Sequence, residues 1–131
     1  MHTLSFDHYT IKVDDLAKSS KFYMDILGLK EIENRTRKEY IRWFSIGNDQ
    51  ELHLVEGDNS QIKTNIGVHI AFRLAHFDKF IDHLKENNIT IHNSKAKAGN
   101  ITVRADGIRQ VYFYDPDGYW IEVNEAANPE L

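Results

Sequence analysis

The sequence has no cysteine among its 131 residues and only two prolines. Without cysteine it can form no disulfide, no thiolate nucleophile and no cysteine metal site, and a reducing compartment is permitted. It has no basic excess, because 16 basic against 20 acidic residues give a formal charge of −4, so a footprint for nucleic acid or anionic lipid is missing. No apolar run approaches the roughly 18 residues of a membrane span, and no signal-peptide core is present. We therefore expect a cytoplasmic protein that binds neither nucleic acid nor membrane.

What the sequence does contain is typical of one globular domain. The apolar fraction is 41% and the charged fraction 27%, which excludes a disordered chain and allows a sizeable core. We treat residues 1–131 as a single domain. Seven histidines in a chain of this length are the first compositional hint of a site.

An internal repeat organises the chain. Placing His8 over His69 aligns "HYTIKVDDLAKSSKFYMDILGL" with "HIAFRLAHFDKFIDHLKENNI", and placing Trp43 over Tyr112 aligns "WFSIGNDQELHLVE" with "YFYDPDGYWIEVNE". Each copy reads as strand, helix and three strands. The repeats cover about residues 5–57 and 67–126, joined by a polar linker over 58–65. This pattern predicts an α+β fold in which two βαβββ repeats form curved mixed sheets around a metal-binding cavity.

The expected elements follow from hydrophobic periodicity and turn residues. Apolar spacing predicts helices over residues 16–27 and about 77–87, with Gly28 ending the first. Gly47-Asn48-Asp49 predicts a tight turn between two strands, and Asp115-Pro-Asp-Gly118 predicts another turn. The segment 94–107 is expected to be a mobile loop. Strands are expected over residues 6–13, 30–35, 40–46, 51–56, 67–74, about 89–93, 110–114 and 120–124.

Four residues that commonly bind metals occupy equivalent places in the two repeats. The alignments place His69 on His8 and Glu122 on His53. Alternate side chains of a strand share a face, so each of the four lies opposite apolar neighbours that would pack against a helix. Three imidazoles and one carboxylate are a good ligand set for one divalent ion such as Zn, Ni, Mn or Fe, with positions left for substrate. We therefore predict a metal site of His8, His53, His69 and Glu122.

The stretches "DHYTIKVDDLAKSSKFYMDILGL", "GVHIAF" and "YFYDPDGYWIEV" resemble the vicinal oxygen chelate superfamily over about residues 5–126. That superfamily includes glyoxalase I, fosfomycin-inactivating enzymes, extradiol dioxygenases, methylmalonyl-CoA epimerase and bleomycin-binding proteins. Its metal ligands stand at the positions of the four residues above. The resemblance implies a glyoxalase-like isomerase or lyase that stabilises an enediolate, with Glu122 as the catalytic base.

Other activities of the superfamily stay open as alternatives. Glyoxalase I has an acid where this chain has His53 and a glutathione-binding asparagine where it has Gly57. Fosfomycin enzymes use two histidines and one glutamate, matching His8, His69 and Glu122, so an epoxide thiol transferase or hydrolase is one alternative. A non-catalytic drug-binding protein is another.

Substrate-binding residues are expected on the first and third strands of the repeats. Lys12 stands where glyoxalase I has an arginine for the glutathione carboxylate. The third strands supply Trp43, Arg109 and Tyr112, and strand register decides which of them faces the cavity. His92 is expected to be half-exposed. The resemblance also implies a homodimer, each site taking His8 and His53 from one subunit and His69 and Glu122 from the other.

Overall fold

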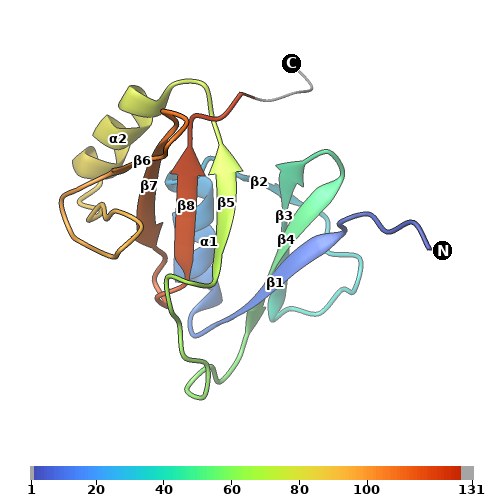
Figure 1. Ribbon diagram of the computed structural model, residues 1–131. Helices are drawn as coiled ribbons and strands as arrows, with labels where there is room; N and C mark the ends of the chain where they lie inside the picture. Colours follow the sequence, from blue (N-terminus) through green and yellow to red (C-terminus); the bar gives the residue numbers. More distant parts are fainter. Residues whose placement is uncertain (1, 128–131) are drawn as a thin grey trace. The chain divides into compact units, whose positions relative to one another are not determined.

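The computed structural model describes residues 2–127, and the chain divides into two compact units, Met1–Ile62 and Lys63–Leu131. Figure 1 follows the order of elements along the chain. The first unit contains β1 (His8–Val13), α1 (Leu16–Asp25), β2 (Lys30–Ile32), β3 (Ile41–Gly47) and β4 (Gln50–Glu56). The second contains β5 (His69–Arg73), α2 (Phe77–Glu86), β6 (Thr102–Val103), β7 (Arg109–Tyr114) and β8 (Trp120–Asn124).

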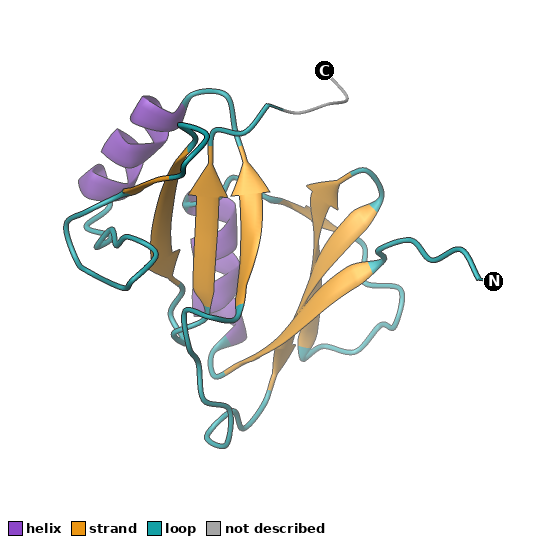
Figure 2. Ribbon diagram, in the orientation of Figure 1, coloured by secondary structure: helices purple, strands orange, loops and turns teal. Residues whose placement is uncertain are grey.

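Each unit has an open four-stranded mixed sheet with the same topology (Figure 2). The strand orders are β1-β4-β3-β2 and β5-β8-β7-β6, so the first strand of each repeat pairs in parallel with the last. The remaining pairs are antiparallel. The predicted α+β fold of two βαβββ repeats is confirmed.

One face of each sheet packs on the helix of its repeat. In the first unit the fully buried side chains of Phe44, Leu52 and Leu54 lie on the face that α1 covers. In the second, the ring of Phe80 on α2 lies 5.9 Å from that of Phe113 on β7. Apolar burial of this kind holds a sheet and a helix together. We call the opposite face of each sheet, which the helix of the same repeat does not cover, its open face.

Local signals in the first repeat place these elements. The Asp15 carboxylate accepts a hydrogen bond from the Lys18 N–H and caps α1, as N-terminal aspartates commonly do. Gly28 has a φ of 67°, and the Leu29 N–H reaches back to the Tyr23 carbonyl at 3.0 Å, which confirms the predicted glycine stop. Asn48 also has a positive φ in the predicted turn between β3 and β4.

The second repeat differs from prediction in its second strand. Residues 89–93 form no strand, and only His92 makes isolated bridges, to Ala98 and Tyr112. The strand that pairs with β7 is instead Thr102–Val103, inside the segment predicted to be a loop. The side-chain amide oxygen of Asn93 accepts hydrogen bonds from the backbone N–H groups of Lys95 and Lys97. The chain therefore turns where the predicted strand would have continued.

The second strand of the first repeat is also shorter than predicted. The prediction covered residues 30–35, whereas β2 ends at Ile32. Asn34 explains the early end, because its side chain donates to the Lys38 and Ile41 carbonyls and accepts from the Thr36 N–H. A side chain that bonds the local backbone in this way replaces the strand ladder with a turn.

Candidate metal centre

Three aromatic rings stack on the open face of the first sheet. The cross-strand register pairs His53 with both Thr10 and Trp43, which places His8 on the same face, two residues before Thr10. The His8 and His53 ring centroids are 4.2 Å apart, and those of Trp43 and His53 are 4.1 Å apart. Both pairs are close to parallel, so the imidazole of His53 lies between two flat rings and is restricted in orientation.

Carboxylates orient the two histidines of the first unit. His8 Nδ1 lies 2.5 Å from the Asp7 carboxylate, and His53 Nε2 lies 2.8 Å from Glu51. A carboxylate only accepts hydrogen bonds, so the nitrogen that faces it carries the proton. In the neutral imidazole the lone pair is then at Nε2 of His8 and at Nδ1 of His53. A carboxylate behind a ligating histidine is a common arrangement in metal sites.

Glu122 accepts four hydrogen bonds on the open face of the second sheet. Its Oε1 lies 2.8 Å from the Tyr112 hydroxyl and 3.1 Å from His69 Nε2. Its Oε2 accepts from the side-chain amides of Gln110 and Asn124, at 3.0 Å and 2.7 Å. Three donors, from Tyr112, Gln110 and Asn124, therefore hold this buried carboxylate in place, and the side of Oε1 that remains faces His69.

These contacts set the protonation states of the glutamate and the tyrosine. Burial raises the pKa of Glu122, but the hydrogen bonds from Asn124, Tyr112 and Gln110 lower it by more, and the net pKa lies below its ordinary value. For Tyr112, burial and the bond to Glu122 both raise the pKa. Glu122 is thus an anion at neutral pH, and the Tyr112 hydroxyl keeps its proton and donates it.

The bond between His69 and Glu122 requires a cation. His69 Nδ1 faces the Ile66 carbonyl at 2.8 Å, and that oxygen can only accept, so Nδ1 carries a proton. A neutral His69 would then direct the lone pair of Nε2 at the anionic oxygen of Glu122. Two acceptors at 3.1 Å attract each other only when a proton or a metal ion neutralises them. A divalent metal that both atoms ligate would supply that charge.

Three imidazoles and one carboxylate fit a divalent transition metal by their chemistry. The four side chains do not form one group in this structure. In residues 2–127, no group of three or more His, Asp or Glu side chains is close enough to hold an ion. Each unit nevertheless presents two predicted ligands on one face. The hydrogen-bond partner of each histidine determines which ring nitrogen carries the proton and which keeps its lone pair. His8 and His69 both hold a proton on Nδ1, which leaves Nε2 for a metal.

The predicted substrate-binding residues divide between the two faces of the sheets. Lys12 and Trp43 lie on the same face as His8 and His53, and Tyr112 lies on the same face as Glu122. Arg109 lies on the other face of β7 from Tyr112. Its guanidinium bonds Glu125 and Asp78 and covers the Phe77 ring at 4.7 Å, so it ties α2 to the sheet.

Two residues that contact the predicted site residues were not themselves among the predicted metal ligands or substrate-binding residues. Glu51 bonds His53, and period-two spacing on β4 does predict that residues 51 and 53 share a face, which makes Glu51 a second choice for the base after Glu122. His92 was expected to be half-exposed, but it is buried, with 8% of its surface accessible. His92 is buried because its backbone bridges to Tyr112. That bridge depends on the conformation of a loop, which the hydrophobic periodicity of the sequence does not predict.

Comparison with known proteins identifies the family. Residues 5–123 match the family model described as glyoxalase/bleomycin resistance protein/dioxygenase superfamily. The chain belongs to this superfamily. A probable lactoylglutathione lyase of Vibrio parahaemolyticus is 28% identical over 134 residues, covering 95% of this chain and 94% of the relative. A metallothiol transferase FosB of Staphylococcus saprophyticus is 26% identical over 129 residues, covering 94% and 78%.

A solved structure gives the same fold. The putative glyoxalase family protein of Bacillus anthracis superposes with a TM-score of 0.76 at 21% identity, covering 97% of this chain and 98% of that one. At that identity the likeness shows the glyoxalase-superfamily fold and carries no reaction with it. None of the helices in residues 2–127 is long and apolar enough to cross a membrane.

Proposed function

We propose that the protein is a divalent-metal-dependent enzyme acting on a small molecule, and that His8, His53, His69 and Glu122 bind one Zn, Ni, Mn or Fe ion per site. The observation that carries the proposal is that His69 Nε2 and the Glu122 carboxylate, two groups that commonly ligate metals, lie 3.1 Å apart on one face of the second sheet. The stacked, carboxylate-backed pair His8 and His53 supports it from the first unit.

The reaction that these residues suit best is a glyoxalase-like isomerisation. A bound divalent ion would polarise two adjacent oxygens of the substrate. Glu122, an anion on the face that carries the proposed ligands, would be the base and would take the proton from the carbon beside the carbonyl. Returning that proton to the neighbouring carbon completes a balanced isomerisation. The Tyr112 hydroxyl, which donates to Glu122 at 2.8 Å, holds the carboxylate in place meanwhile.

Three further residues are proposed to contact the substrate. Lys12, Trp43 and Tyr112 lie on the faces that carry the proposed ligands. Lys12 offers a positive charge to an anionic substrate group. The Trp43 ring is stacked on His53 and covered by the Arg35 guanidinium at 4.7 Å, so it would present its apolar edge to a substrate. Arg109 is left out of this set because Glu125 and Asp78 already occupy its guanidinium.

Thiol transfer to an epoxide is the second candidate. Metallothiol transferases match nearly the whole chain, and one observation in the first unit favours a three-ligand site. His53 is buried, and His8 and Trp43 cover both faces of its ring, so a metal ion reaches it less easily than it reaches the exposed His8. His8, His69 and Glu122 would remain, and the metal would keep one more position open for an epoxide oxygen.

Metal analysis of protein purified without an affinity tag tests the proposal. After reconstitution with each of the four metals we expect about one equivalent per chain. His8→Ala and His69→Ala should each bind less than half of that, whereas His76→Ala, an exposed histidine outside the site, should bind as much as the parent. Full-length protein that binds less than half an equivalent would favour the drug-binding alternative.

An activity screen then separates the two enzyme candidates. Hemithioacetals of glutathione and of other thiols should be isomerised by the metal-loaded protein, and Glu122→Gln should abolish that activity. Turnover of an epoxide with a thiol, and of no hemithioacetal, would favour the second candidate. Activity on catechols alone, dependent on iron and oxygen, would contradict both.

We also propose that the protein is a homodimer with two equivalent sites. In this proposal His8 and His53 come from one subunit and His69 and Glu122 from the other. It rests on the even division of the ligands, two to each unit of the chain, together with the superfamily resemblance. Two-fold dimers place such pairs symmetrically, so both sites form at once.

A further inference from the structure

Three aromatic side chains form a cluster on the open face of the second sheet. His92, Tyr114 and Trp120 make up this aromatic cluster. The His92 and Trp120 rings meet edge to face with centroids 5.0 Å apart, and Tyr114 and Trp120 do so at 5.3 Å. His92 and Tyr114 are 5.7 Å apart. None of these residues belongs to the proposed ligand set.

The backbone holds His92 firmly in the aromatic cluster. Its N–H donates to the Tyr112 carbonyl at 2.7 Å, and its carbonyl accepts from the Tyr112 N–H at 2.9 Å. On the next residue back, the Ile91 carbonyl accepts from Gly99 at 2.8 Å. With both neighbouring segments bonded, the ring of His92 has a fixed place beside Tyr114 and Trp120.

His92 has an unpaired nitrogen at this place. Within residues 2–127, only Ser20 Oγ and His92 Nδ1 are fully buried side-chain nitrogen or oxygen atoms without a hydrogen-bond partner. Solvent does not reach this nitrogen, so water does not compensate it. An unpaired buried polar group is costly, and a site that served only packing would be filled better by phenylalanine. This nitrogen is therefore left for a polar group that enters from outside the described residues.

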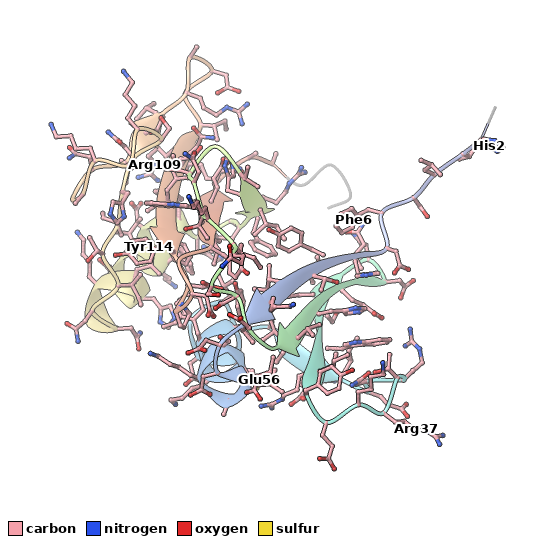
Figure 3. All side chains as sticks on the ribbon, turned by 90° about the horizontal axis from the view of Figure 1, so that it is seen from below. His2, Phe6, Arg37, Glu56, Arg109 and Tyr114 are labelled. Atoms are coloured by element: carbon pink, nitrogen blue, oxygen red, sulfur yellow. The ribbon has the colours of Figure 1, made fainter. Side chains whose placement is uncertain are left out.

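The aromatic cluster adjoins the proposed metal ligands and is partly open to solvent. Trp120 on β8 is the cross-strand neighbour of His69 on β5, and neighbouring strands are roughly 4.8 Å apart. Tyr114, the last residue of β7, is labelled in Figure 3. Its exposed fraction is 48%. Its ring touches Trp120 and His92 on one side and solvent on the other, so it can rotate into solvent and admit a ligand beside His92.

We propose that the aromatic cluster binds a phenolic ring of the substrate, with the phenol hydroxyl hydrogen-bonded to His92 Nδ1. Trp120 and Tyr114 provide the ring surfaces. A hydroxyl both donates and accepts, so it can pair with Nδ1 in either tautomer of the imidazole, whereas a carbonyl or an ammonium could pair with only one. This inference rests on the proposed function in that the ring would be part of the same substrate that reaches His69 and Glu122.

Binding of two matched compounds tests the inference without requiring metal or turnover. The compounds are 4-hydroxyphenylacetamide and phenylacetamide, which are neutral and differ by one hydroxyl. Calorimetric titration of the full-length protein in a chelator should show about tenfold tighter binding of the hydroxylated compound, as expected for pairing a buried polar group. Because no metal is present, failure of the metal proposal would leave this result unchanged.

Substitutions in the aromatic cluster complete the test. His92→Phe should remove the tenfold preference while phenylacetamide binds within about twofold of its affinity for the parent, and the matched His76→Phe should keep the preference. Tyr114→Ala, at an exposed position that should not affect folding, should weaken both compounds about fivefold. Equal affinities in the parent, absence of binding, or a preference that survives in His92→Phe or is untouched by Tyr114→Ala would each overturn the inference.

Discussion

His69 and Glu122 lie on neighbouring parallel strands, with Nε2 of one 3.1 Å from Oε1 of the other. Behind His69 is a backbone carbonyl, and around Glu122 are the side chains of Tyr112, Gln110 and Asn124. The two residues are therefore oriented before any ligand binds. Such preorganisation from surrounding groups is what raises the affinity of a metal site and fixes its geometry.

Glu122→Gln should destabilise the metal-free protein as well as weaken metal binding. The substitution removes the charge that strengthens all of the hydrogen bonds to Glu122, and an NH2 group turned toward Gln110 and Asn124 would meet two donors. Turned the other way it can donate to the Tyr112 hydroxyl oxygen or to Nε2 of a neutral His69, but those neutral bonds are weaker. We expect a loss of about 1–3 kcal/mol in the free energy of unfolding. Urea unfolding in a chelator measures it, with the exposed Glu33→Gln as control. A variant as stable as the parent would show that these contacts do not hold Glu122.

Glu125 should make stability depend on acid pH through its bond to Arg109. Hydrogen bonds from the Arg109 guanidinium hold the pKa of Glu125 below its ordinary 4.5. A carboxyl with a lowered folded pKa stabilises the protein above its unfolded pKa, and that contribution is lost as pH falls through the folded value. Glu125→Gln should thus be less stable than the parent at pH 7, and the difference should shrink steadily below about pH 4.5.

Thermal unfolding from pH 7 to pH 3 measures this dependence. Glu39→Gln, at an exposed glutamate of the first unit, is the matched control and should follow the parent at every pH. Parallel curves for the parent and Glu125→Gln would contradict the prediction. The result also bears on Arg109, because a guanidinium engaged in this way serves to hold α2 and β7 together.

Much of the fold could be predicted because its signals are local. Alternation at β8 and helical spacing at α2 gave bounds within a residue of those observed, and Gly28 marked the end of α1. The repeat then placed His8, His53, His69 and Glu122 on open faces, since period two leaves no other choice once their apolar neighbours are buried.

Other features depend on contacts between distant residues and could not be predicted. The pairing of Thr102 with Gln110 decides where the second strand of the second repeat lies, and the apolar spacing of Ile89 and Ile91 suggests a different place. Burial of His92 follows from its bridge to Tyr112. The face of Arg109 follows from the register of β7, where a shift of one residue would reverse it.

Trp43 should stabilise the orientation of His53 by stacking. Trp43→Leu removes the flat ring 4.1 Å from the imidazole and leaves unfilled volume at a buried position, so we expect a loss of about 2–4 kcal/mol in the free energy of unfolding. Metal affinity should also fall, by roughly tenfold, if His53 is a ligand. Trp43→Phe keeps a ring and should lose much less of both. Unchanged metal affinity in Trp43→Leu would favour the three-ligand site of His8, His69 and Glu122.

Mixing two inactive variants should reveal whether sites are shared between subunits. His8→Ala and Glu122→Ala each remove one proposed ligand, and each homodimer should be inactive. If His8 of one subunit and Glu122 of the other serve one site, an exchanged heterodimer has one intact site and one that lacks both residues. Half of the dimers are heterodimers at statistical exchange, so activity should return to about a quarter of the parent's. Native mass spectrometry confirms the exchange, and no recovery in exchanged protein would mean that each site is built within one chain.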